Sequence, residues 1–288
     1  MNDSVLPFIF ESFPVRGALV QLENTWQRMQ QDHSYASPVS EVLGHAAAAT
    51  SLIARSLKFE GSVTLQISSN GPLGTLVMQS TDGLSLRGMS TAADVADGIS
   101  FADLVTGARC AVTIDTGSTE RPYQGIVEIR PESLAASLEN YFAKSVQVLS
   151  HLALISCDAF CGGILLQQMP GDLPISKDDW SRLGYLAATL RLVDIDNGAT
   201  PGLLHRLFPE DDIRVFEPAT ARFQCRCSQA KVEDVLRFLG ESETRAALVE
   251  TGQVDVTCEY CGKVRSFDAV DVSRVFSDLV IKGSSALH

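Results

Sequence analysis

The chain has 288 residues, 45% hydrophobic and 20% charged, a composition typical of a globular protein with a sizeable core. Its net charge of −12 disfavours binding to nucleic acid and to anionic membrane surfaces. The sequence shows no signal peptide and nothing near the ~20 apolar residues that span a membrane, so we expect a cytoplasmic protein without nucleic-acid or membrane partners.

Residues 1–171 predict an α+β core domain. The first predicted helix covers residues 37–59, with Ser37 as its cap, Pro38 in its first turn and apolar residues on one face. Apolar and polar residues alternate from Gly61 onward, and turn signals separate further apolar runs, so we expect an antiparallel meander. Its strand-like runs are residues 63–67, 73–79, 84–88, 111–115 and 123–129. A second helix should begin at Pro131, with an apolar stripe of Leu134, Leu138, Phe142, Val146 and Leu149.

Residues 172–222 are interpreted as a helical, metastable linker. Ser176 and Asp179 form a variant of the capping box, and a second short helix should follow Pro201. The apolar residues of the first linker helix recur with helical spacing, and we expect this stripe to pack on the outer face of the meander. It consists of Trp180, Leu183, Ala187 and Leu190.

The remaining segment, residues 223–288, predicts a small C-terminal zinc-binding module. Cys225 and Cys227 are separated by one residue, and Cys258 and Cys261 by two. A helix expected at residues 231–239 lies between the pairs. Two cysteine pairs around a compact insert are typical of one tetrahedral zinc ion. Gly262 can adopt a positive φ, which would let a tight turn direct the second pair inward.

A site with four cysteine ligands leaves no position for a substrate, so we expect no catalysis at this zinc. It could be purely structural, since the module is too small for a large core. Residues 225–227 favour a redox switch, because a disulfide between residues i and i+2 is strained and therefore labile.

The other three cysteines are interpreted as small apolar core residues. Cys110 lies beside a predicted strand. Cys157 and Cys161 are four residues apart, so on a helix they would share a face and could pair or bind metal. His151 and His205 have no paired ligand spacing and are interpreted as structural or surface residues.

Motifs along nearly the whole chain carry a resemblance to one family. They are PVRG at 14–17, SLKFEG at 56–61, AVTID at 111–115, YQGIVEI at 123–129, SLENYF at 137–142, GGILLQ at 162–167, LLHRLF at 203–208, CRCS at 225–228 and VTCEYCG at 256–262 followed by FDAVDV. In this order the motifs resemble the 33 kDa redox-regulated heat-shock chaperones, also called 33 kDa chaperonins.

The resemblance implies a holdase that is inactive while reduced and bound to one zinc ion. Oxidation would then form the disulfides Cys225–Cys227 and Cys258–Cys261 and expel the metal. The linker would unfold and expose the stripe defined above to unfolded client proteins. The reduced form would be a monomer and the oxidised form a homodimer. The three additional cysteines are not part of the family's four-cysteine motif, so further disulfides stay open.

Three alternatives compete with this interpretation. They are an enzyme that carries a structural zinc ribbon, a thiol oxidoreductase that uses residues 258–261 as its active disulfide, and a zinc-ribbon nucleic-acid binder, which the net charge of −12 disfavours. The sequence contains no Walker loop, HExxH, GxSxG elbow or dinucleotide fingerprint, which disfavours the enzyme. A thiol oxidoreductase needs a single catalytic pair, whereas this chain has two.

Overall fold

The computed structural model describes residues 3–57, 61–81, 83–117, 121–170, 175–195 and 198–284, with side chains described as far as Ser277. The fold is mixed α+β, as predicted, and the chain divides into two compact units, Met1–Gln224 and Cys225–His288. The division of the first unit into a core and a linker stays a prediction, because residues 171–174 at the proposed boundary lie outside the described residues.

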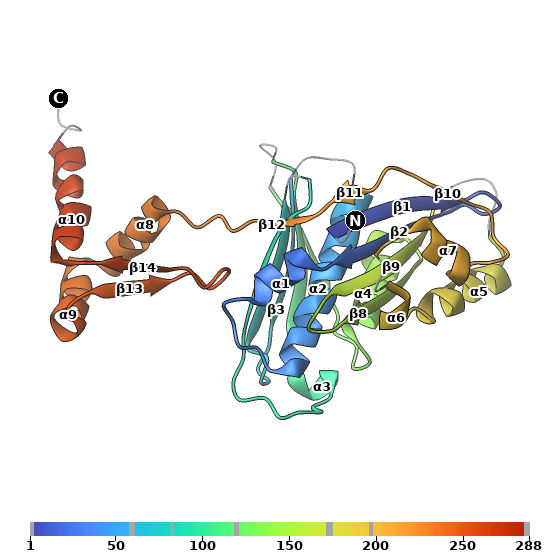
Figure 1. Cartoon of the computed structure of the whole chain (residues 1–288), viewed down its shortest axis with the longest axis horizontal. Coiled ribbons are helices and arrows are strands. Elements are labelled where there is room, and N and C mark those ends of the chain that lie inside the picture. Colours follow the sequence, from blue (N-terminus) through green and yellow to red (C-terminus); the bar gives the residue numbers. More distant parts are fainter. Residues whose placement is uncertain are drawn as a thin grey trace. The chain divides into compact units, whose positions relative to one another are not determined.

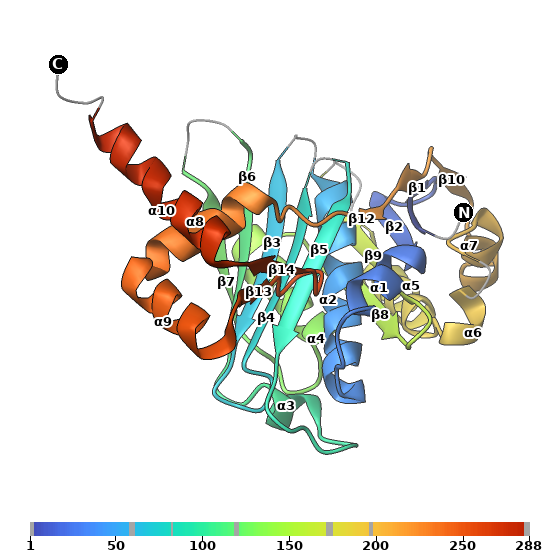
Figure 2. The ribbon, with the colours of Figure 1, turned by 60° about the vertical axis from the view of Figure 1, so that its left-hand side comes forward.

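All the predicted strands of the first unit are present. They are β3 (Ser62–Ser68), β4 (Thr75–Thr81), β5 (Ser85–Thr91), β6 (Arg109–Asp115) and β7 (Tyr123–Val127). Figure 2 shows β3, β4 and β5 side by side in the sheet β12-β5-β4-β3-β6-β7, in which β12 (Arg222–Phe223) runs parallel to β5 and all other neighbours are antiparallel.

The order of these strands corrects the expected meander, because β6 pairs with β3 and not with β5. The chain between β5 and β6 contains α3 (Phe101–Leu104) and crosses to the other side of β3. Two backbone hydrogen bonds hold this crossover on the β3–β4 turn: Asn70 N–H donates to Thr106 O (3.1 Å) and Leu73 N–H donates to Leu104 O (3.1 Å). Turn signals identify strands but not which strands become neighbours.

A second sheet, which the sequence analysis did not anticipate, is formed by the two ends of the first unit. Its strands are β1 (Asp3–Phe10), β2 (Val15–Leu22), β8 (Ser150–Ser156), β9 (Cys161–Gln168), β10 (Ile213–Val215) and β11 (Ala219–Thr220). The order is β10-β1-β2-β9-β8, with β11 also paired to β1, and every pairing is antiparallel. Cys157 and Cys161 therefore belong to a β-hairpin and not to a helix.

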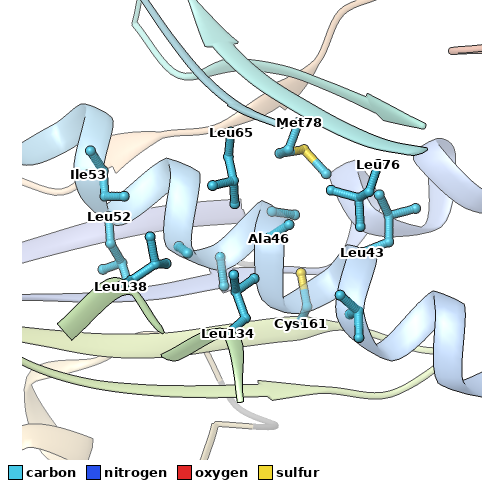
Figure 3. Close-up of a cluster of buried hydrophobic side chains, with 14 of the residues drawn as sticks. Leu43, Ala46, Leu52, Ile53, Leu65, Leu76, Met78, Leu134, Leu138 and Cys161 are labelled. Atoms are coloured by element: carbon cyan, nitrogen blue, oxygen red, sulfur yellow. The ribbon is translucent and has the colours of Figure 1, made fainter. Parts of the chain in front are cut away.

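The helix α2 (Ser37–Ser56) lies between the two sheets. Figure 3 shows Leu65, Leu76 and Met78 reaching this helix from one side, and Leu134, Leu138 and Cys161 from the other. The helix was predicted correctly, but its cap was not: Ala36 is the N-cap, and no side chain caps the first turn. The chain becomes extended at Leu57, and Phe59, the expected end, lies outside the described residues. The short helix α1 (Asn24–Gln30) precedes α2.

The predicted helix after Pro131 is shorter than its apolar stripe suggested. It consists of α4 (Leu134–Tyr141) and a π-helical turn, η1 (Phe142–Val146), which ends where Gln147 adopts the left-handed conformation with φ 57°. The wider π turn shifts the helical register, so Leu134 and Leu138 are buried whereas Val146 and Leu149 are exposed.

Residues 175–223 contain the predicted helices and also supply β10, β11 and β12. The helices are α5 (Lys177–Ala188), α6 (Leu192–Ile195) and α7 (Pro201–Leu207). Ser176 caps α5 as predicted: its Oγ accepts from Asp179 N–H at 3.0 Å. The three helices cover the face of the β1-β2-β9-β8 sheet that is turned away from α2 (Figure 1).

The C-terminal unit has its own small core. It contains α8 (Gln229–Leu239), α9 (Glu241–Thr251), the hairpin β13 (Val254–Thr257) and β14 (Val264–Phe267), and α10 (Ala269–Ser284). Among the side chains described, up to Ser277, its buried apolar residues are Val232, Leu236, Phe267, Val272, Val275 and Phe276. A core of this size needs an additional source of stability.

Candidate metal centre

The turn between β13 and β14 directs two cysteines to the same side. Cys258 O accepts from Cys261 N–H (3.3 Å) and from Gly262 N–H (2.8 Å), and Cys258 N–H donates to Lys263 O (3.1 Å). Gly262 closes this turn with φ 63°, the conformation that its sequence position predicted. The antiparallel pairing of the two strands fixes where the turn begins and ends.

The first cysteine pair lies on the irregular segment between β12 and α8. Cys227 N–H approaches Cys225 Sγ at 3.5 Å. Ser228 then caps α8, because its Oγ accepts from Lys231 N–H at 3.3 Å. Because Ser228 is the N-cap, the helix begins at Gln229, and the side chains of both cysteines lie outside it.

The four sulfurs of Cys225, Cys227, Cys258 and Cys261 all lie within 4.8 Å of one another. Two contacts between the pairs are 3.6 Å, Cys225 Sγ to Cys258 Sγ and Cys227 Sγ to Cys261 Sγ. Tetrahedral sulfur ligands at about 2.3 Å from a zinc ion are about 3.8 Å apart, whereas sulfurs in a disulfide are about 2.05 Å apart. The arrangement therefore fits a bound metal ion and not a disulfide.

The electrostatics of the cluster are those of a site that needs a cation. Burial raises the pKa of Cys225, and burial raises that of Cys261 to about 12, where hydrogen bonds with the other three thiols add to the shift. Burial acts in the same sense on Cys227, but hydrogen bonds from the other thiols and from Arg265 outweigh it and lower the pKa. Closely spaced thiols cannot all ionise alone, and a divalent cation removes this penalty.

In the described part of the chain, the four-cysteine cluster is the one group of side chains that could hold a metal ion. The other three cysteines are not part of it. Cys110 and Cys161 are buried in the core around α2, as predicted. Burial raises the pKa of Cys110 to about 12 and that of Cys161 well above its usual value. Cys157 contacts the core on the opposite face of the second sheet, which disfavours a Cys157–Cys161 disulfide.

The predicted linker stripe packs on the second sheet, which corrects the expected packing on the meander. Leu183, Ala187 and Leu190 are buried in the apolar cluster on this face of the second sheet, where α5 lies against β8, and Trp180 is half-buried beside them. The reason is that the second sheet, absent from the sequence prediction, offers the adjacent apolar face. Whether the stripe binds clients stays a prediction.

Two contacts of the linker helix α5 were missed by the sequence analysis. The imidazole of His151 on β8 stacks on the Trp180 indole, with ring centroids 4.4 Å apart. Arg182 donates two hydrogen bonds, of 2.8 and 2.7 Å, to the buried carboxylate of Asp211. No sequence signal joins these pairs, because their members lie on separate elements. His205 is exposed on α7.

None of the helices described is long and apolar enough to cross a membrane. The family model described as Hsp33 protein matches residues 3–268. A 33 kDa chaperonin of Nitrosococcus oceani is 38% identical over 97% of this chain and 96% of its own length. One of Methylobacillus flagellatus is 34% identical over 100% of this chain and 99% of its own.

Among solved structures, the crystal structure of a 33 kDa chaperonin from Thermotoga maritima matches with a TM-score of 0.83. It is 22% identical and the match covers 97% of this chain and 99% of that one, a likeness that supports the fold. Because the family model matches nearly the whole chain and the two relatives are more than 30% identical to it, the chain belongs to the Hsp33 family of 33 kDa chaperonins.

Proposed function

We propose that the protein is a redox-regulated holdase, inactive while the C-terminal cysteines are reduced and hold one zinc ion. The observation that carries the proposal is the convergence of four cysteine sulfurs within 4.8 Å, in a chain of a chaperone family. Zinc is the metal that an all-cysteine tetrahedral set favours in a structural site, and it would supply folding energy to the C-terminal unit.

Oxidation of the cysteines is the proposed trigger. Two thiolates, one molecule of hydrogen peroxide and two protons from solvent give one disulfide and two molecules of water, so the four sulfurs consume two molecules of peroxide. The proposed pairs are Cys225–Cys227 and Cys258–Cys261. Sulfurs that have formed disulfides are no longer thiolates, and the cluster then cannot retain a divalent ion.

Loss of the metal would unfold the C-terminal unit, because its apolar core is small and zinc contributes of order 10–16 kcal/mol in such modules. The N-terminal unit ends next to the cluster in sequence: Gln224 N–H donates to Leu86 O at 2.8 Å, one residue before Cys225. Unfolding would therefore begin at the base of β12 and continue into the linker. The exposed stripe of α5 would bind unfolded clients.

The partners in this proposal are client proteins and, in the oxidised state, a second copy of the chain. The reduced protein would be monomeric. The proposed location is the cytoplasm, where thiols stay reduced until oxidants accumulate. With a net charge of −12, the chain is not expected to bind nucleic acid or anionic membranes.

The test is an aggregation assay with a thermally unfolding client. Zinc-loaded, reduced protein should leave client aggregation unchanged, and peroxide-treated protein should suppress it. Reduction with a dithiol and added zinc should reverse the effect. Suppression that is equal before and after oxidation would contradict the proposal. Turnover of a disulfide substrate with a dithiol reductant would instead indicate a thiol oxidoreductase.

A further inference from the structure

A cavity of about 240 Å³ lies against the second sheet of the N-terminal unit. It is lined by the last turn of α2, by β1, β2 and β9, and by Phe216, which follows β10. Three of the motifs that carry the family resemblance contribute residues to it, those at 14–17, 56–61 and 162–167. The cysteine cluster uses none of these residues, so the metal centre does not account for the cavity.

The pairing of the strands sets six lining residues in two rows on one face of the sheet, because residues two apart on a strand point to the same side. The first row is Pro7, Ala18 and Leu165, and the second row is Ile9, Arg16 and Gln167. The first row is apolar, and two of its members belong to the core around α2. The second row therefore brings a guanidinium next to an apolar surface.

Arg16 is held beside the cavity by a chain of hydrogen bonds. Its Nη2 donates to Gln167 Oε1 at 2.9 Å, and Gln167 Nε2 donates to Ser150 Oγ at 3.3 Å. Gln167 and Ser150 are buried, so this chain fixes the position of the guanidinium. Among the described residues, Gln167 is the one acceptor that Arg16 contacts. A guanidinium has five N–H donors, and the others are available to a ligand.

Arg55, in the last turn of α2, is a second cation at the same cavity. Its Nε is buried and has no hydrogen-bond acceptor among the described residues. A buried donor of a charged group is costly in free energy when it loses water and gains no partner. The described lining contains no acidic residue, although the chain has 35 of them. The cavity thus combines two guanidinium groups with an apolar surface and lacks an anion among these residues.

We propose that this cavity binds a small organic carboxylate with an apolar body. A carboxylate accepts paired hydrogen bonds from guanidinium groups and would supply the acceptor that Arg55 lacks. A cavity of about 150 Å³ can hold benzene, so this larger one admits a ring with a short chain. The apolar row would contact the ring, and the two arginines would bind the carboxylate. The inference goes beyond the proposed function, because it needs neither the metal nor oxidation of the cysteines.

Calorimetric titration of the full-length, reduced, zinc-loaded chain with phenylacetate tests the site. We expect saturable binding of one phenylacetate per chain. Phenylacetamide keeps the ring without the charge, and acetate keeps the charge without the ring, so each should bind at least about 10-fold more weakly. Equal binding of the amide would overturn the proposal, because the arginines would then not select the ligand. Equal binding of acetate would overturn it too, since the apolar surface would have no role.

Substitutions locate the binding in this cavity. Arg16→Gln and Arg55→Gln should each weaken phenylacetate binding about 10-fold, because each removes a charged donor. Arg16→Lys keeps the charge but not the planar donor set, so it should recover part of the affinity. The control is Arg109→Gln, which removes an exposed arginine on β6 of the other sheet and should bind phenylacetate like the unmodified chain.

Unchanged affinity in both glutamine variants of the cavity would refute the site. An equal loss in Arg109→Gln would also refute it, because the effect would then follow the charge of the whole chain. If neither glutamine variant folds, Arg16→Lys and Phe216→Ala decide the question, and unchanged affinity in both would exclude the cavity. A short peptide that ends in phenylalanine carries the same carboxylate and ring but should bind more weakly than phenylacetate. Tighter binding of the peptide would overturn the assignment to a small free acid.

Discussion

The seven cysteines of this chain differ in chemistry because their surroundings differ. Burial raises the pKa of the Cys110 thiol to about 12 and leaves it protonated. The four clustered cysteines are partly exposed and lie where a cation can keep them as thiolates. Since the thiolate is the form that oxidants attack, we expect the buried Cys110 to be inert and the clustered cysteines to react.

Replacing one clustered cysteine should weaken the binding of zinc to the C-terminal unit. In Cys258→Ser, a hydroxyl replaces a thiolate, so we expect zinc affinity to fall and the reduced unit to become sensitive to protease. The number of zinc ions bound per chain measures the first effect. The rate of tryptic cleavage at Lys and Arg residues of the C-terminal unit measures the second.

Cys157→Ser is the matched control for this experiment. Its Sγ donates to Phe160 O at 3.5 Å, a contact that a serine hydroxyl can also make, and it lies outside the cluster. This variant should bind one zinc ion and resist protease like the unmodified chain. Full zinc occupancy in Cys258→Ser would rule out ligation by that residue.

At the residue scale, the spacing of the four cysteines predicted that they form one cluster. It did not predict which other residues contact them. Ligand spacing and Gly262 are local properties, so they can be read without a fold. The hydrogen bond between Arg265 and Gln229 depends on the register Val256↔Arg265 and on where α8 begins. Both are properties of the folded unit, and no spacing rule contains them.

At the scale of elements, α5 is held on the second sheet by a small set of contacts. Leu183, Ala187 and Leu190 are buried in the core below the helix, and Trp180 stacks on His151. The bidentate pair between Arg182 and Asp211 joins α5 to the loop after α7. A helix held by few contacts can separate from the sheet without unfolding of the core around α2.

Trp180→Ala should weaken the packing of α5 and lower the oxidant concentration that activates the chaperone. The variant loses a half-buried indole and its stacking on His151, which we estimate to cost about 2 kcal/mol. Client aggregation measured against peroxide concentration gives the threshold. Tyr185→Ala is the control, because Tyr185 is 76% exposed on the same helix. An unaltered threshold in Trp180→Ala would remove this contact from the switch.

Packing of α5 should also depend on pH through His151. Burial lowers the pKa of this imidazole below 6.5, while a hydrogen bond with the Trp180 backbone opposes the shift. A lowered pKa means that the stabilisation is present above pH 6.5 and is lost as the pH falls through the folded-state value. Glu139 lies 3.9 Å away, and burial raises its pKa, so its contribution has the opposite sign.

Hydrogen exchange of α5 amides between pH 7.5 and 5.5, corrected for intrinsic rates, tests this expectation. Protection should decrease toward the acidic end in the unmodified chain and change little in His151→Phe, which keeps a ring on Trp180 but cannot titrate. His45, whose pKa burial lowers to about 4, is present in both proteins and cancels in the comparison. Glu139 contacts His151, so the two proteins are compared in a Glu139→Gln background. Equal profiles in the two proteins would exclude His151 as the titrating group.

The two sheets show why one was predictable and the other was not. Strand β3 alternates between buried and less buried residues, which is the period-two signal. Strand β9 is buried at seven consecutive positions, because α2 covers one face of its sheet and α5 to α7 cover the other. A strand covered on both faces has no alternation, so periodicity cannot distinguish it from a buried helix.

At the scale of the whole molecule, the division into two units separates the four clustered cysteines from the other three. Cys110, Cys157 and Cys161 lie in the unit Met1–Gln224, and the four clustered cysteines lie in Cys225–His288. We expect the two sheets and α2 to stabilise the first unit without a metal, and the small core described in the second unit to need one. Oxidation should therefore unfold one unit and leave the sheets of the other intact.

Thiol and zinc counts on one sample test this division. Of seven thiols, four should be lost to peroxide together with one zinc ion, and seven minus four leaves three that remain free. Alkylation in denaturant after oxidation, followed by mass spectrometry, should label Cys110, Cys157 and Cys161. Loss of zinc with all seven thiols still free, or oxidation of Cys110 and Cys161 at the same rate as the cluster, would contradict it. The second outcome would mean that the core around α2 opens during activation, because both thiols are buried there.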